Sequence, residues 1–141
     1  MFGKILVGTD GSDTASKAVQ HAADIAAATG SELLILSAYP PPKPEAGSTF
    51  GPATPYAGPE IARSVLADAE KRLAGSAKVR TLMREGEAAD AICDIAEEEG
   101  AGLIVVGNRG MTGAKRFLLG SVPNNVSHHA PCSVLIVHTT D

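Results

Sequence analysis

Short apolar runs alternate along the chain with longer stretches in which apolar residues recur every three or four positions. The short runs are rich in Val, Ile and Leu and are followed by glycine or turn residues, so they predict β-strands. The predicted strands are 4–8, 33–36, 79–84, 103–106 and 133–138. The longer stretches predict amphipathic helices, at 13–28, 61–73, 88–96 and 122–130.

A regular alternation of strand and helix favours right-handed βαβ crossovers. The expected fold class is therefore α/β, a doubly wound parallel sheet of five strands with helices on both faces. The chain of 141 residues is expected to form one domain, 1–141. The run 33–36 is apolar at every position, which is typical of a central strand covered on both faces.

Two charged segments modify this picture. Arg80 and Arg84 interrupt the run 79–84, which fits an edge strand better than a central one. Glu97-Glu98-Glu99 ends the third predicted helix, where the helix dipole disfavours negative charge. This acidic segment is expected to be a solvated patch, with a partner-docking surface as the alternative.

The segment 39–59 breaks the compact pattern. It holds seven of the nine prolines and lacks apolar periodicity. A loop of about 20 residues is unusual in a compact domain and is commonly functional or disordered. It follows the second strand at the carboxyl edge of the sheet, so it is either a flexible loop or a contact over a site there.

Composition narrows the classes of function. The formal charge of −4 argues against nucleic acid or an anionic membrane as the partner. Neither a membrane span nor a signal peptide is evident, so a cytoplasmic protein is expected. Cys93 and Cys132 have no CxxC spacing and are interpreted as small buried hydrophobic residues, and the four histidines have no metal-ligand spacing.

The most specific chemical signal is Gly107-Asn108-Arg109-Gly110, followed after nine residues by Gly120-Ser121. Glycines let phosphate oxygens approach the backbone, and the N-terminus of the next helix favours an anion. Ser121 could cap that helix or donate its hydroxyl to phosphate. Pro123 suits the first helical turn but has no N–H to donate, which leaves Gly120, Ser121 and Val122 as donors. Two glycines alone are equally consistent with a tight turn.

A second turn, Thr9-Asp10-Gly11-Ser12, follows the first strand and would meet the glycine turn at the same edge of the sheet. Asp10 could accept from a ribose hydroxyl or an adenine amino group; the alternative is that it caps the first helix. Arg109, Lys115 and Arg116 could screen phosphate charge or be solvated loop cations. Neither a Walker loop nor a GxGxxG fingerprint is present.

These residues together resemble the universal stress protein family. The resemblance rests on the opening segment 4–12, the pattern Gly107-x2-Gly110-x9-Gly120-Ser121 and the ending 131–137. It implies strand order 3-2-1-4-5 and ATP at the ends of strands one and four, with Mg²⁺ or Mn²⁺ held mainly by the phosphates. The implied contacts are Thr9, Asp10 and Gly11 near adenine and ribose, Ala38 from the second strand, Val106 and Gly107 lining the turn, and Gly110, Gly120, Ser121 and Val122 on the phosphates.

The family resemblance also implies a homodimer formed through the last strand, Ser133 to Val137, which would otherwise leave an apolar edge unpaired. The function expected is ATP binding in stress response or signalling, without a catalytic residue. Three alternatives stay open: a cAMP-binding protein of the same fold, a slow ATPase or autophosphorylating enzyme, and a ligand-free interaction module.

Overall fold

The computed structural model describes residues 2–42, 56–75, 78–108 and 120–139. Five parallel strands form one sheet in the order β3-β2-β1-β4-β5. The strands are β1 (Lys4–Gly8), β2 (Glu32–Tyr39), β3 (Val79–Glu85), β4 (Leu103–Gly107) and β5 (Ser133–Val137). The helices are α1 (Asp13–Thr29), α2 (Gly58–Arg72), α3 (Ala88–Glu99) and α4 (Ser121–His129). The predicted fold class, and the strand order that the resemblance implied, are confirmed.

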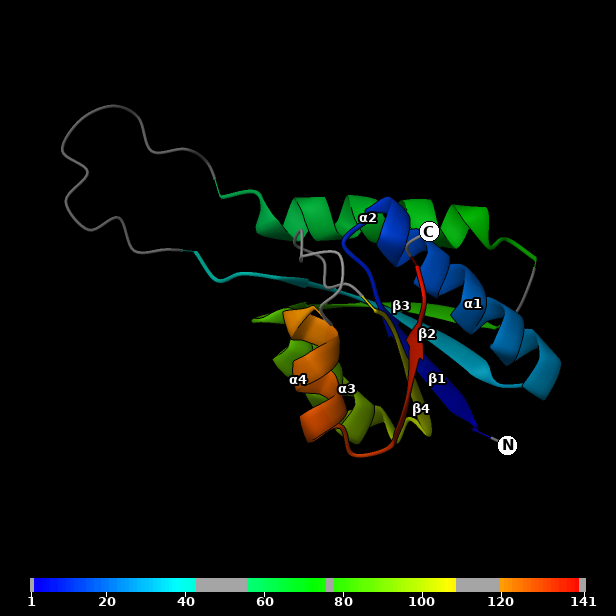
Figure 1. Ribbon diagram of the computed structural model, residues 1–141. Coiled ribbons are helices and arrows are strands. Elements are labelled where there is room, and N and C mark those ends of the chain that lie inside the picture. Colours follow the sequence, from blue (N-terminus) through cyan, green and yellow to red (C-terminus); the bar gives the residue numbers. More distant parts are fainter. Residues whose placement is uncertain (1, 43–55, 76–77, 109–119, 140–141) are drawn as a thin grey trace, which may run out of the picture.

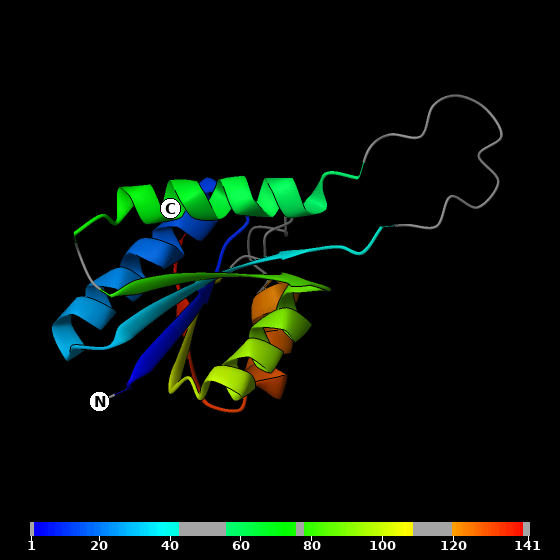
Figure 2. The ribbon, with the colours of Figure 1, turned by 180° about the vertical axis from the view of Figure 1, so that it is seen from behind.

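The sheet lies between two layers of helices (Figure 1, and from behind in Figure 2), with α1 and α2 on one face and α3 and α4 on the other. Alternate residues of each central strand point to opposite layers. Thus Ile5 and Val7 pack beneath α1 and α2, whereas Leu6 packs with α3 and α4. The all-apolar run of β2 has this cause, because both of its faces are covered.

Helix ends follow the local sequence. Ser12 caps α1, its side-chain oxygen accepting from the Ala15 amide at 3.2 Å. Gly30 and Gly100 end α1 and α3 in the left-handed conformation that glycine adopts without strain. None of the described helices is long and apolar enough to cross a membrane.

β3 is an edge strand, as Arg80 and Arg84 predicted. The two arginines pair with the acidic end of α3: Arg84 with Glu98 (Nη1 to Oε2, 2.6 Å) and Arg80 with Glu99. Lys4 also donates to the Glu99 carboxylate. Glu97 and Glu98 are exposed, as expected for a solvated patch, and Glu99 is partly buried. The cations that pair with Glu98 and Glu99 come from neighbouring strands, which local sequence does not reveal.

Cys93 and Cys132 are free thiols, half-buried against the core between the sheet and α3 and α4. Burial raises the pKa of both thiols, which keeps them protonated. Their interpretation as small hydrophobic residues stands, although neither is fully buried.

The segment 43–55 lies outside the described residues. Its two flanks are close together, because the Tyr56 hydroxyl donates to the Pro40 carbonyl. Tyr39, the last residue of β2, accepts from the Gly86 amide at 2.8 Å. The described residues on either side of this segment, Pro40 and Tyr56, therefore lie close together beyond the end of β2.

Candidate functional site

The candidate site is the point at which the chain connectivity reverses, between β1 and β4. These strands are hydrogen-bonded neighbours, with Val7 opposite Val105. The chain leaves β1 for α1 on one face of the sheet, and it leaves β4 toward α4 on the other face. In open α/β sheets, ligands bind at the carboxyl edge where the connections diverge in this way.

Three hydrogen bonds hold the turn after β1. The Thr9 amide donates to the Leu36 carbonyl at 2.9 Å, and buried Thr9 accepts through Oγ1 from the Gly11 amide at 3.1 Å. Asp10 Oδ1 accepts from the Ser12 amide at 2.9 Å. Since Ser12 caps α1, the alternative in which Asp10 caps it is wrong. The Asp10 side chain is exposed at the sheet edge, with one carboxylate oxygen engaged in the turn.

Gly11 has φ +84°, and a Cβ at this position would lie 3.1 Å from Cγ2 of Val65 in α2. A left-handed backbone and close packing against α2 both favour glycine here. Contact with α2, which covers the same face of the sheet as α1, therefore favours this one conformation of the turn.

The turn after β4 is organised by Asn108. Its amide donates to the Val137 carbonyl at 2.7 Å, and its carbonyl accepts from the Gly120 amide at 3.1 Å. Its side-chain Oδ1 accepts from the amide (2.9 Å) and the hydroxyl (3.0 Å) of Thr139. The sequence did not predict a role for Asn108 or Thr139 in this turn, because 31 positions separate them. An asparagine directly after a strand was the one local indication of a bond from its side chain to the backbone.

The N-terminus of α4 presents backbone amides beside this turn. Gly120 is the N-cap residue, with φ −63° and ψ 163°, and no side chain caps the helix. Ser121 is therefore the first helical residue and not the cap. The Gly120 amide is engaged by Asn108, and Pro123 is buried with no N–H. The amides of Ser121 and Val122 belong to the first turn, where no carbonyl four residues earlier in the helix accepts from them.

The remaining predicted residues divide into two groups. Val106 is buried in the core beneath α3 and α4, and Ala38 lies half-buried over the same core, so each offers its backbone more than its side chain. Gly107 is half-buried at the end of β4. Arg109 and Gly110, together with Lys115 and Arg116, lie outside the described residues.

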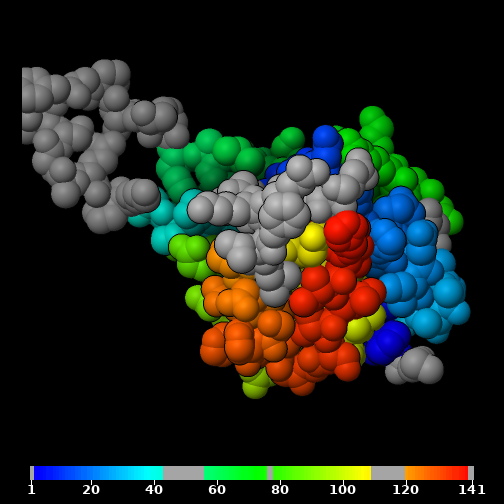
Figure 3. Space-filling model, viewed as in Figure 1, coloured from blue at the N-terminus to red at the C-terminus, as the bar shows by residue number. Residues whose placement is uncertain are grey.

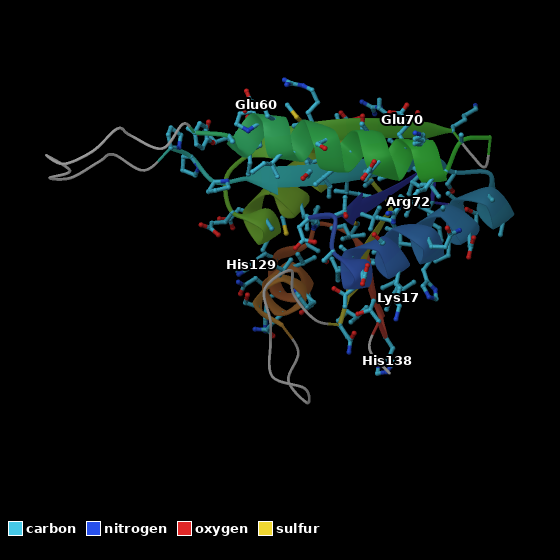
Figure 4. The ribbon with its side chains drawn as sticks, turned by 90° about the horizontal axis from the view of Figure 1, so that it is seen from above. Lys17, Glu60, Glu70, Arg72, His129 and His138 are labelled. Atoms are coloured by element: carbon cyan, nitrogen blue, oxygen red, sulfur yellow. The ribbon has the colours of Figure 1, made fainter. Side chains whose placement is uncertain are left out.

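A cleft of about 270 Å³ runs between α1 and α2. Thr9, Asp10 and Gly11 are among the residues that line it. Arg72 of α2, which Figure 4 labels beside α1, donates from Nη1 to Oγ of Ser16 in α1 at 3.5 Å. Ala38, Val106 and Gly107 do not line it. The described residues that line the cleft therefore belong to the β1 turn, to α1 and to α2 with its C-cap.

The described residues contain no group of three His, Cys, Asp or Glu side chains that could hold a metal ion. Asp10 is the carboxylate of the β1 turn and is exposed at the carboxyl edge of the sheet.

Comparisons with known proteins agree with this architecture. The profile of the Universal stress protein family matches residues 1–138. The universal stress protein Rv1636 of Mycobacterium tuberculosis (strain ATCC 25618 / H37Rv) is 42% identical over 148 residues, covering 96% of each chain.

Among solved structures, a universal stress protein in complex with cAMP is similar with a TM-score of 0.78 and 32% identity, covering 99% of each chain. The universal stress protein of Archaeoglobus fulgidus in complex with dAMP has a TM-score of 0.70 and 26% identity, covering 96% of this chain and 97% of that one. On this evidence the chain belongs to the universal stress protein family.

Proposed function

We propose that the protein binds ATP between the β1 and β4 turns and acts as a nucleotide-dependent component of stress response or signalling in the cytoplasm. The observation that carries the proposal is the reversal of connectivity between β1 and β4. It brings an exposed aspartate, the end of β4 at Gly107 and the N-terminus of α4 to one edge of the sheet.

Each turn supplies groups that suit a different part of the nucleotide. The Ser121 and Val122 amides, at the positive end of the α4 dipole, suit phosphate oxygens. Asp10 has a second carboxylate oxygen to accept from a ribose hydroxyl or an adenine amino group. In this proposal Gly110 and Arg109 also contact the phosphates. The backbones of Ala38, Val106 and Gly107 line the site. Relatives of known structure hold cAMP and dAMP, which supports an adenine nucleotide.

Mg²⁺ or Mn²⁺ would accompany ATP, held mainly by phosphate oxygens. The cation would offset the charge of the triphosphate, while the protein contributes amide donors. No residue of the chain is assigned a catalytic role.

Titration calorimetry of nucleotide-free protein with ATP and Mg²⁺ tests the proposal. Binding that saturates with one ATP per chain is expected, and absence of binding at millimolar ATP would overturn it.

Ser121→Pro sharpens the test, because it removes one proposed donor and leaves the helix intact. Proline is favoured at the first helical position, and Gly120 has the extended conformation that a following proline requires. We expect Ser121→Pro to weaken ATP binding about tenfold, the value of one hydrogen bond to a charged group. The matched control Ser121→Ala removes only the hydroxyl and separates its contribution from that of the amide.

cAMP is the second candidate, favoured by the small number of donors at α4. With the Gly120 amide engaged and Pro123 without an N–H, two amides remain, which suits one phosphate better than three. A relative with 32% identity was crystallised with cAMP. Competition of cAMP against labelled ATP on the same protein decides between the two ligands.

The proposed assembly is a homodimer formed by antiparallel pairing of β5. This strand lies at the sheet edge, paired with β4 on one side, and exposes Leu135 and Ile136. Pairing with a second copy would cover both side chains and satisfy the free edge.

A further inference from the structure

The end of the chain after β5 is connected to the glycine turn through Asn108. In the described residues Asn108 engages three of its polar groups: its amide with Val137, its carbonyl with Gly120, and Oδ1 twice with Thr139. It therefore joins the end of β4, the N-cap of α4 and the segment that follows β5. No other residue of the site has partners in so many elements of the described chain.

The side chain of Asn108 has a defined orientation. The Thr139 backbone N–H can only donate, so the atom that receives it must be the carboxamide oxygen. The Thr139 hydroxyl is directed to the same oxygen. Two donors on one acceptor fix the plane of the carboxamide and thus hold the backbone of residue 108 in place.

Thr139 is itself immobilised. It is 2% exposed, and its carbonyl accepts from Nζ of Lys17 in α1 at 3.2 Å. In Figure 4, Lys17 of α1 lies near His138, the residue that follows β5. The segment after β5 is thus held between α1 and the β4 turn.

We propose that Asn108 is a positioning residue of the nucleotide site and that Thr139 is the residue that fixes it. This inference rests on the proposed nucleotide-binding function. The connection runs from Thr139 to the Asn108 side chain, then from the Asn108 carbonyl to the Gly120 amide. Gly120 is the N-cap that sets the position of the Ser121 and Val122 amides. The segment after β5 is therefore a part of the phosphate-binding side of the site that does not touch the ligand.

The proposal predicts a ligand-selective loss on Thr139→Val, which deletes the hydroxyl and preserves the shape of the side chain. ATP affinity is expected to fall between about twofold and tenfold, the range for one net hydrogen bond. Adenosine, which has no phosphate, should bind Thr139→Val within about twofold of the wild type. Thr139→Ser keeps the hydroxyl and should restore ATP affinity.

Thr29→Val is the matched control. Thr29, like Thr139, is a threonine with a hydrogen-bonded hydroxyl, which donates to the Ile25 carbonyl at 2.8 Å. It is partly buried and lies at the C-terminus of α1, at the opposite end of the strands from the candidate site. It should leave the ratio of ATP affinity to adenosine affinity unchanged. If Thr139→Val and Thr29→Val change this ratio equally, or if neither changes it, the proposal is overturned.

A measurement on the wild type does not depend on how Thr139→Val folds. Saturating ATP should slow hydrogen exchange at the amides of Gly120 and Thr139, and Lys17→Met should reduce that protection at Thr139. If ATP binds and the Thr139 amide exchanges at its ligand-free rate, Thr139 is not coupled to the site. Failure of the wild type to bind ATP at all would instead overturn the proposed function itself.

Discussion

Gly11 shows how one residue of the β1 turn serves both shape and packing. Its φ of +84° lies in the region that other residues adopt only at a cost, and Val65 of α2 fills the space where a Cβ would stand. Gly75, after α2, has the same φ, but nothing lies within 4 Å of its missing Cβ. The two glycines separate backbone strain from steric contact.

Gly11→Ala should therefore destabilise the protein by more than Gly75→Ala does. Strain alone is worth about 1–2 kcal/mol in both variants, and contact with Val65 adds to it only at position 11. Urea unfolding measures both effects. Gly11→Ala should also weaken ATP binding, because it displaces Asp10; equal ATP affinity in the two variants would show that the β1 turn takes no part in binding.

Asp10 permits a substitution that spares its structural role. Asp10→Asn keeps Oδ1 as the acceptor of the Ser12 amide and replaces the second carboxylate oxygen with an amide NH2, which donates and cannot accept. If that second oxygen accepts from the nucleotide, ATP affinity should fall about tenfold, as for other hydrogen bonds to a charged group. Calorimetry with ATP on Asp10→Asn measures this loss. Asp24→Asn is the control, because Asp24 lies in α1 and accepts a hydrogen bond from Gln20.

At the scale of elements, β3 and α3 are joined by charge. Arg80 and Lys4 hold the pKa of the Glu99 carboxyl below its ordinary value of 4.5, with the hydrogen bond from Arg80 as the largest cause. The same hydrogen bond raises the pKa of Arg80. This network ties the β3 edge and the start of β1 to the C-terminus of α3, on the side of the sheet away from the candidate site.

The sign of the pH dependence follows from the lowered pKa. A carboxylate that is more acidic when folded stabilises the protein above its unfolded pKa, and this contribution disappears as the pH falls through the folded value. We expect the free energy of unfolding to decrease below about pH 4.5, and to decrease less in Glu99→Gln. Urea titrations between about pH 6 and pH 3 measure this. Glu97→Gln is the control, and an acid limb as shallow in Glu97→Gln as in Glu99→Gln would contradict the assignment.

Element types and their order followed from sequence, because buried parallel strands and amphipathic helices have distinct periodicities. The rotation of each helix about its axis, and contacts between residues far apart in the sequence, did not follow from it. Ile61, the first apolar residue of the predicted helix 61–73, is 61% exposed, whereas its neighbour Ala62 is buried, because periodicity fixes the spacing of a buried face better than where that face begins. The link between Asn108 and Thr139 has no local signal at all, whereas Gly120, Ser121 and Pro123 could be placed because helix N-termini carry one.

At the scale of the molecule, helices cover both faces of the sheet, while β5 forms one of its edges. In Figure 3 this C-terminal segment lies at the surface beside α4. Leu135 and Ile136 are each 38% exposed there, on opposite faces of the same strand. An apolar edge strand of this kind favours pairing with another strand, and a second copy of the chain offers an identical one.

Ile136→Lys should therefore shift the proposed dimer toward monomer. In a two-fold dimer each substitution is present twice, so two lysines would enter one interface and repel each other. We expect the dimer dissociation constant to rise at least about tenfold, measured by sedimentation equilibrium over a range of concentrations. Ile61→Lys places the same change on the exposed face of α2, away from β5, and should leave the dimer intact.

Because Asn108 bonds to Val137 at the end of the same strand, the monomeric variant should also bind ATP less tightly than the wild type. Unchanged sedimentation of Ile136→Lys would place the interface elsewhere, and unchanged ATP affinity in a true monomer would separate β5 pairing from the nucleotide site.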